Sequence, residues 1–159
     1  MNTKVKPIPD GFHALTPYLI VKGAAQAMEF YKTAFGATER FRAPVPGGDK
    51  IGHAEMVIGD SILMLADDFP NFDVHAPEGN SGGSQSLVLY VADCDAVFNR
   101  AVAAGAKVKQ PLQNKFYRDR SGCVIDPFGH HWTLMTHVED VSPEEMDRRM
   151  KAELAKKAK

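Results

Sequence analysis

An internal repeat limits the possible folds of this 159-residue chain more than any other feature. In each half, the apolar residues change period in the same order, from a strand to a helix and then to three further strands. Matching landmarks keep a nearly constant spacing, because Val21 and Val91 lie 70 residues apart and Leu65 and Leu134 lie 69 apart. A repeat of this length with the same element order predicts two similar β-α-β-β-β modules.

The elements of the first module follow from periodicity and from the positions of glycine and proline. We expect a helix over residues 23–35, because apolar residues recur at helical spacing and Gly36 stands where a C-cap glycine belongs. Pro17 indicates an edge position or an irregular start for the strand before this helix. The expected strands of this module cover residues 15–21, 39–43, 51–58 and 61–66.

The second module is predicted in the same way and closes with a hairpin. Asp93 fits the N-cap of a helix that ends at Gly105. In the segment Asp126-Pro127-Phe128-Gly129, proline fixes its own φ and glycine can take a positive φ, so we expect a turn between two strands. The other expected extended segments are residues 87–91, residues 107–109, and a segment flanked by residues 116–118 and 123–125.

A separate helix is expected at the C-terminus. Ser142 and Glu145 form a capping-box pattern, and Met146, Met150 and Leu154 make a narrow apolar stripe that predicts docking on the domain or on a partner. The expected organisation is an arm (1–12), a first module (13–67), a linker loop (68–84), a second module (85–137) and a C-terminal helix (138–159).

Composition narrows the function classes. The net charge is −1, which argues against a general nucleic-acid or membrane surface. No apolar run approaches the ~20 residues that a membrane helix needs, and the first residues lack the apolar segment of a signal peptide. Cys94 and Cys123 have no metal or redox spacing, so we expect both to be reduced in a cytoplasmic protein.

Three motifs resemble one known family. They are residues 28–37 (MEFYKTAFGA), residues 52–56 (GHAEM) and the Asp-Pro-Phe-Gly-His hairpin at residues 126–130. Together with the repeat, they resemble the vicinal oxygen chelate superfamily over roughly residues 12–137. This superfamily includes glyoxalase I, extradiol dioxygenases, and fosfomycin- and bleomycin-resistance proteins, and the first two motifs resemble its PhnB-like branch.

The resemblance implies an α+β fold, in which two β-α-β-β-β modules form a curved, mostly antiparallel open sheet with the helices outside, plus the C-terminal helix. It also implies a homodimer with cavities built from both modules. Metal-using members such as glyoxalase I take His, Gln or Glu ligands from the first and last strands of each module. Those positions carry Thr16, Met64, Ser86 and Thr133 here, and neither hydroxyls nor a thioether suit a hard divalent ion. We therefore expect no metal cofactor at the superfamily's usual site.

Strand alternation predicts which side chains face the concave side of the sheet. In the strand at 51–58, His53 and Glu55 fall on that side, and Arg120 is matched to His53 across the repeat. Tyr117 lies in a loop at the expected rim. The composition of this cavity suits an organic ligand. The expected ligand-binding residues are Thr16, Tyr18, His53, Glu55, Met64, Ser86, Tyr117, Arg120, His131 and Thr133.

The pair His53 and Glu55 has three interpretations. In the first, the pair completes a displaced metal site with His131, since imidazole and carboxylate bind Zn, Ni or Fe. In the second, the pair performs general acid–base catalysis. The third, which we favour, is mutual hydrogen bonding or simple ligand contact on a partly solvated sheet. Arg120 either clamps an anionic ligand or forms a structural ion pair beside Asp119, and we favour the ion pair.

Two functions from different classes follow. The first is a metal-free protein that binds a small organic molecule, similar to the bleomycin-resistance type. The second is a metal-dependent lyase, isomerase or dioxygenase with a non-standard site around His53, Glu55 and His131. The first is favoured because the four usual ligand positions carry Thr, Met, Ser and Thr.

Overall fold

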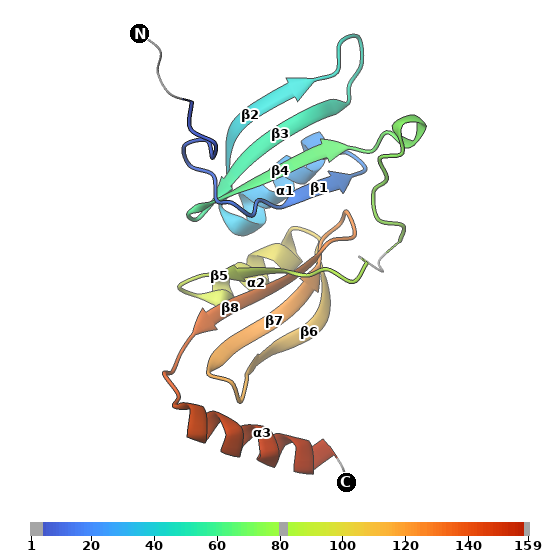
Figure 1. The fold of residues 1–159 in the computed structure, drawn as a ribbon. Helices are drawn as coiled ribbons and strands as arrows, with labels where there is room; N and C mark the ends of the chain where they lie inside the picture. The colour runs from blue at the N-terminus through green and yellow to red at the C-terminus, as the bar shows by residue number, and fades with distance from the viewer. Residues whose placement is uncertain (1–4, 80–82, 158–159) are drawn as a thin grey trace. The chain divides into compact units, whose positions relative to one another are not determined.

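Two compact units make up the chain, which divides between Gly83 and Ser84. The computed structural model describes residues 5–79 and 83–157. Each unit contains a four-stranded mixed sheet with one helix across one face (Figure 1). In each sheet the first strand pairs in parallel with the last, and the other neighbours pair antiparallel. The predicted α+β class with two β-α-β-β-β modules is confirmed.

The first unit has the strand order β1-β4-β3-β2. Its elements are β1 (Tyr18–Val21), α1 (Ala24–Phe35), β2 (Thr38–Pro44), β3 (Ile51–Ile58), β4 (Ser61–Asp67) and a short 3-10 helix, η1 (Pro70–Phe72). Met28 and Tyr31 lie on one face of α1 and are fully buried, as are Met56 and Leu65 of the sheet. The predicted helix and the strand at 51–58 are confirmed, whereas β1 begins three residues later than expected, directly after Pro17.

The second unit has the equivalent order β5-β8-β7-β6. Its elements are β5 (Leu87–Tyr90), α2 (Cys94–Ala103), β6 (Lys107–Asn114), β7 (Asp119–Ile125), β8 (His131–His137) and α3 (Pro143–Lys157). The expectation of a short strand at 107–109 is wrong, because β6 continues through Pro111, which an edge strand tolerates. Residues 116–118 lie in the turn before β7, where Arg118 takes a φ of 86°.

The last strand of each unit caps that unit's helix. In the first unit, Asp67 Oδ1 accepts the backbone N–H groups of Gly23 and Ala24, both at 2.9 Å, and its Oδ2 accepts that of Ile51 at 2.7 Å. In the second, Thr136 Oγ1 accepts the N–H of Cys94 at 2.9 Å. The spacing of the repeat therefore extends to a pair of capping groups that differ in chemistry, one a buried carboxylate and the other a hydroxyl.

The Asp-Pro-Phe-Gly hairpin is held by the side chain of Asp126. Its Oδ1 accepts the backbone N–H groups of Phe128 and His130, and its Oδ2 accepts the indole N–H of Trp132, all at 2.9 Å. Gly129 closes the turn with a φ of 92°. The carboxylate thus serves the fold, because it fixes the point at which β8 begins.

The C-terminal helix α3 starts as predicted, with the Ser142 hydroxyl accepting the backbone N–H of Glu145 at 3.3 Å. Met150 and Leu154 of its apolar stripe are exposed and do not pack on the second unit, so docking of this stripe on a partner stays a prediction. Among the described residues, no helix has the length and apolar character needed to cross a membrane.

Candidate functional site

A row of four side chains crosses the first sheet on the face opposite α1. Tyr18 is paired with Met64, Met64 with Glu55, and Glu55 with Phe41, so one residue comes from each strand. Direct cross-strand partners share a face of the sheet. The two ends of the row, Tyr18 and Phe41, are 47% and 50% exposed. The row therefore presents two aromatic rings to solvent with a thioether and a carboxylate between them.

A chain of hydrogen bonds runs along this face from Tyr18 to Arg40. The Tyr18 hydroxyl lies 3.0 Å from His53 Nδ1, and His53 Nε2 lies 3.4 Å from Glu55 Oε1. Arg40 Nη1 donates to Glu55 Oε2 at 2.9 Å. Desolvation raises the pKa of the Tyr18 phenol. When the Tyr18 hydroxyl donates to Nδ1, the imidazole proton lies on Nε2 and faces the carboxylate.

Arg40 reaches this face because β2 contains a β-bulge. The pairing shifts between Glu39, which opposes Met56, and Phe41, which opposes Glu55, so Arg40 is the extra residue. A bulge places one additional side chain beside its neighbour and often lies near a functional site. The Arg40 guanidinium also packs 4.8 Å above the Phe12 ring, which ties the strand to the N-terminal arm.

A pocket of about 450 Å³ opens beside this row. The arm supplies one apolar wall, and the sheet supplies a floor of Met64 and Glu55 with Arg40 at its side. This volume lies within the ordinary range for small-molecule sites. The lining residues are Pro7, Ile8, Pro9, Phe12, His13, Ala14, Thr16, Arg40, Glu55 and Met64. The predicted candidates Thr16, Glu55 and Met64 therefore share one pocket, and Tyr18 and His53 adjoin it.

The second unit repeats this geometry with different side chains. Its equivalent row is Val88, Thr133, Cys123 and Gln110. The β6 register also shifts, between Val108 and Gln110, which makes Lys109 the counterpart of Arg40. The two units thus share the bulge and its basic residue, but the aromatic rings and the carboxylate occur in the first row alone.

His131 and its neighbours occupy the corresponding face of the second unit. Lys109 Nζ donates to His131 Nδ1 at 2.9 Å, and His131 is only 7% exposed. Among the described residues, His131 Nε2 has no hydrogen-bond partner. Ser86 and Thr133, two of the predicted candidates, hydrogen-bond to each other through their hydroxyls at 3.1 Å.

The candidates for a displaced metal site are not assembled within either unit. His53 and Glu55 are neighbours in the first unit, whereas His131 belongs to the second and pairs with Lys109. Across residues 5–79 and 83–157, no three His, Cys, Asp or Glu side chains gather in a way that suits a metal ion. A metal at His53 and Glu55 would need further ligands from elsewhere.

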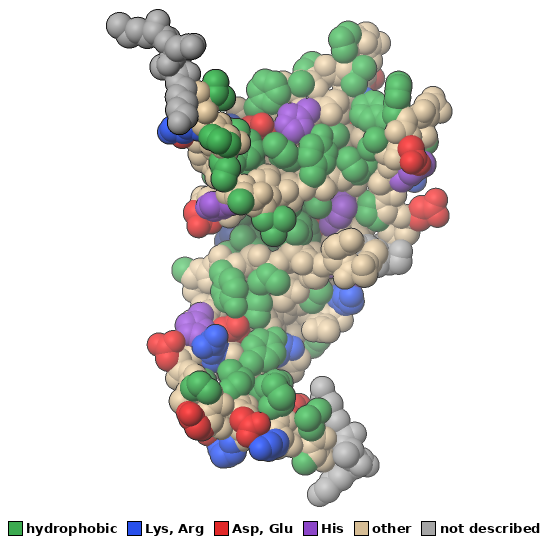
Figure 2. All heavy atoms as spheres, in the orientation of Figure 1, with side chains coloured by type: hydrophobic (Ala, Val, Ile, Leu, Met, Phe, Trp, Pro, Cys, Tyr) green, Lys and Arg blue, Asp and Glu red, His purple; other side chains and the backbone are tan. Residues whose placement is uncertain are grey.

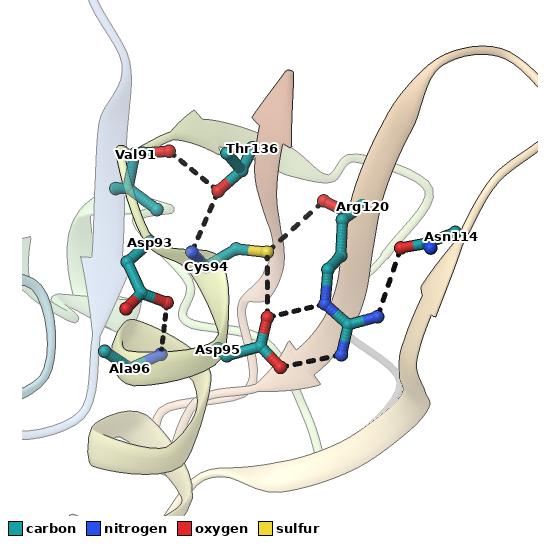
Figure 3. A network of polar contacts seen from close by, with 8 residues as sticks. All are labelled: Val91, Asp93, Cys94, Asp95, Ala96, Asn114, Arg120 and Thr136. Atoms are coloured by element: carbon teal, nitrogen blue, oxygen red, sulfur yellow. Dashed lines mark hydrogen bonds and ion pairs between the residues drawn. The ribbon is translucent and has the colours of Figure 1, made fainter. Parts of the chain in front are cut away.

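Arg120 does not face the sheet surface on which we expected it. Its side chain lies on the α2 side, where Nε and Nη2 bind the two Asp95 carboxylate oxygens at 2.5 and 2.7 Å and Nη1 binds Asn114 (Figure 3). The guanidinium lowers the pKa of Asp95 through these hydrogen bonds. The register matches Ser121, not Arg120, to His53. Arg120 therefore forms a structural ion pair, but its partner is Asp95 and not the adjacent Asp119.

Tyr117 lies in the turn between β6 and β7 of the second unit, edge-on to Phe116, with the two ring centroids 5.2 Å apart. Its contact with a ligand stays a prediction. Arg40 was missed, because simple strand alternation places it on the helix side. One signal was available, since Arg40 and Lys109 are 69 residues apart, the spacing of the repeat.

The doubled β-α-β-β-β arrangement defines the class of fold, and a fold of this kind can host unrelated functions. The chain belongs to the glyoxalase/bleomycin resistance protein/dioxygenase superfamily, whose family model matches residues 11–134. It is 41% identical over 143 residues to an uncharacterized protein of Mycobacterium tuberculosis, with 88% of this chain and 84% of the relative covered.

Solved structures agree with this assignment. TioX from Micromonospora sp. ML1 is 28% identical, with 79% of this chain and 99% of that chain covered and a TM-score of 0.62. A protein from Pseudomonas aeruginosa is 29% identical, with 79% and 98% covered and a TM-score of 0.63. A PhnB protein from Bacillus cereus shares the fold at 19% identity, covering 78% and 99% with a TM-score of 0.62.

Proposed function

We propose that this protein binds a small organic molecule in the pocket of its first unit and does so without the superfamily's usual metal site. The pocket of about 450 Å³ carries the proposal, because it joins apolar walls from the arm to a few fixed polar groups on the sheet. Glu55 and Arg40 are already paired at its side, so they can orient a ligand without a large cost of ordering.

The chemistry of the usual ligand positions supports a metal-free site. Thr16 and Met64 lie in the pocket lining, and Ser86 and Thr133 hydrogen-bond to each other. Hydroxyl and thioether groups are poor ligands for Zn²⁺, Mn²⁺ or Fe²⁺. The second candidate, a metal-dependent lyase, isomerase or dioxygenase, draws on the neighbouring His53 and Glu55, whose side chains are of the right type.

A pocket-filling substitution tests the binding proposal. We would screen a library of small organic compounds by thermal shift and then measure the hits by calorimetry. Ala14→Trp should abolish binding, because Ala14 is exposed and lines the pocket, so that an indole fills it without disturbing the core. Ala103→Trp is the matched control, since this residue is exposed on α2 of the other unit. Hits that bind both variants equally would refute the proposal.

Metal analysis of the purified protein separates the two candidates. We expect no stoichiometric divalent ion and no stabilisation by Ni²⁺, Zn²⁺, Mn²⁺ or Fe²⁺ in a thermal-shift series. A stoichiometric ion that is lost on His53→Ala would overturn the metal-free proposal and favour the enzyme.

A further inference from the structure

We propose that the ligand of the first unit is a flat aromatic ring that carries a hydrogen-bond donor, stacked on the exposed rings of the sheet and donating to Glu55. This inference rests on the proposed function and specifies its ligand class. Three features support it: the cluster of rings, the remaining acceptor capacity of one carboxylate oxygen, and the different side chains at the equivalent row of the second unit.

The rings gather around His53. Its centroid lies 5.5 Å from that of Tyr18 and 6.1 Å from that of Phe41. Both outer rings are about half exposed. Figure 2 shows hydrophobic side chains and a histidine together on the face of the first unit that is turned toward the viewer. Large aromatic surface left in solvent beside a pocket favours a partner that can stack on it.

Glu55 provides one acceptor among these rings. Its Oε2 is held by Arg40 at 2.9 Å, whereas its Oε1 has the 3.4 Å contact to His53 Nε2, longer than the usual 2.7–3.2 Å range. An ionised carboxylate accepts and never donates, and its side chain is only 16% exposed. A donor such as an ammonium or amine N–H therefore gains a charge-assisted bond at Oε1 in a partly desolvated place.

The second unit shows that these groups are not a requirement of the fold. The equivalents of Tyr18, Glu55 and Phe41 are Val88, Cys123 and Gln110, which provide neither a stacking surface nor a charge. The sheet therefore forms without these groups at the row positions. The second unit carries its own ring and carboxylate further along the same face, where Tyr90 donates to Asp119 at 3.0 Å, so the placement of the rings beside Glu55 and the pocket is particular to the first unit.

Three small probes separate the ring from the donor. The probe 2-naphthylmethylamine has a flat ring and an ammonium, 2-naphthoate has the same ring and a carboxylate, and cyclohexylmethylamine has the ammonium without a flat ring. Titration calorimetry should rank the first probe as the tightest. Equal affinity for cyclohexylmethylamine would overturn stacking, and equal affinity for 2-naphthoate would overturn the donor assignment.

Two substitutions locate the contacts. Phe41→Leu should weaken the binding of 2-naphthylmethylamine about threefold to tenfold. Phe72→Leu, which changes a 79% exposed ring of the same unit, should leave this affinity unchanged. Glu55→Gln should remove the preference over 2-naphthoate, while Glu29→Gln on α1 should leave it intact. If none of the probes binds but library hits remain sensitive to Ala14→Trp, this inference fails and the binding function stands. If no compound is sensitive to Ala14→Trp, the binding function itself fails.

Discussion

Removal of the Asp67 carboxylate should destabilise the first unit severely. This side chain accepts three backbone N–H groups and belongs to a residue that is 5% exposed. A hydrogen bond to a charged group contributes about 1.5–3 kcal/mol, and a buried donor left without a partner carries its own penalty. Three such bonds, with partial replacement by water, give an expected loss of about 4 kcal/mol for Asp67→Ala. A unit with ordinary stability of about 5–15 kcal/mol would become marginal.

The assay is equilibrium urea unfolding followed by far-UV circular dichroism, with hydrogen exchange at the Ile51 amide as the local probe. Asp67→Asn should lower the free energy of unfolding by about half as much. Its carbonyl oxygen can keep the hydrogen bonds at the start of α1, whereas its NH₂ group would face the Ile51 N–H and could not accept from it. Asp60→Ala is the control, since Asp60 is exposed in a turn and accepts the Ser61 hydroxyl.

A free energy of unfolding only about 1 kcal/mol or less below that of Asp60→Ala would refute the predicted role of Asp67. Exposed substitutions typically change this free energy by no more than about 0.5 kcal/mol. A functional effect should accompany the structural one. Ile51 begins β3, the strand that carries His53 and Glu55, so a frayed start of β3 should also weaken ligand binding in the pocket.

Two further predictions concern the second unit. A Cβ added at Gly122 would lie 2.6 and 2.9 Å from two ring carbons of Phe98, so Gly122→Ala should cost about 1–3 kcal/mol in urea unfolding. Gly52→Ala meets its nearest atom at 3.5 Å and should cost less than about 1 kcal/mol; equal losses would contradict the packing argument. The Asp119 carboxylate, and then Asp140, raise the pKa of His137 above its ordinary 6.5. The folded state then binds this proton more tightly, so the associated stability is complete below pH 6.5 and is lost as the pH rises through the raised pKa. An NMR titration of the His137 ring should show this pKa moving down toward 6.5 in Asp119→Asn, and an unchanged value would contradict it.

The fold was predictable because its signals are local and occur twice. The period of apolar residues gave the strand at 51–58 at its observed bounds and the helix at 23–35 to within one residue. The errors in the strand bounds arose at two prolines. β1 begins only after Pro17, and β6 continues past Pro111 because an edge strand needs no backbone N–H donor at that position.

The site was predictable only in part. Alternation along β3 correctly placed His53 and Glu55 on the face opposite α1, and Tyr18 and Met64 joined them. Arg40 was missed and Arg120 was misplaced because their positions depend on register, which the sequence of one strand does not contain. The bulge in β2 and the pairing of β7 with β8 emerge only when neighbouring strands align.

The paired bulges have an evolutionary consequence. Because Arg40 and Lys109 are extra residues, their side chains join the sheet face without moving any neighbour to the opposite side. One substitution at a bulge can therefore change the charge of a sheet face. The strand register and the core stay intact, because the bulged residue has no partner on the neighbouring strand. After duplication of an ancestral module, substitutions at these bulged positions would allow the two halves of one chain to acquire different ligand preferences without a change of fold in either half.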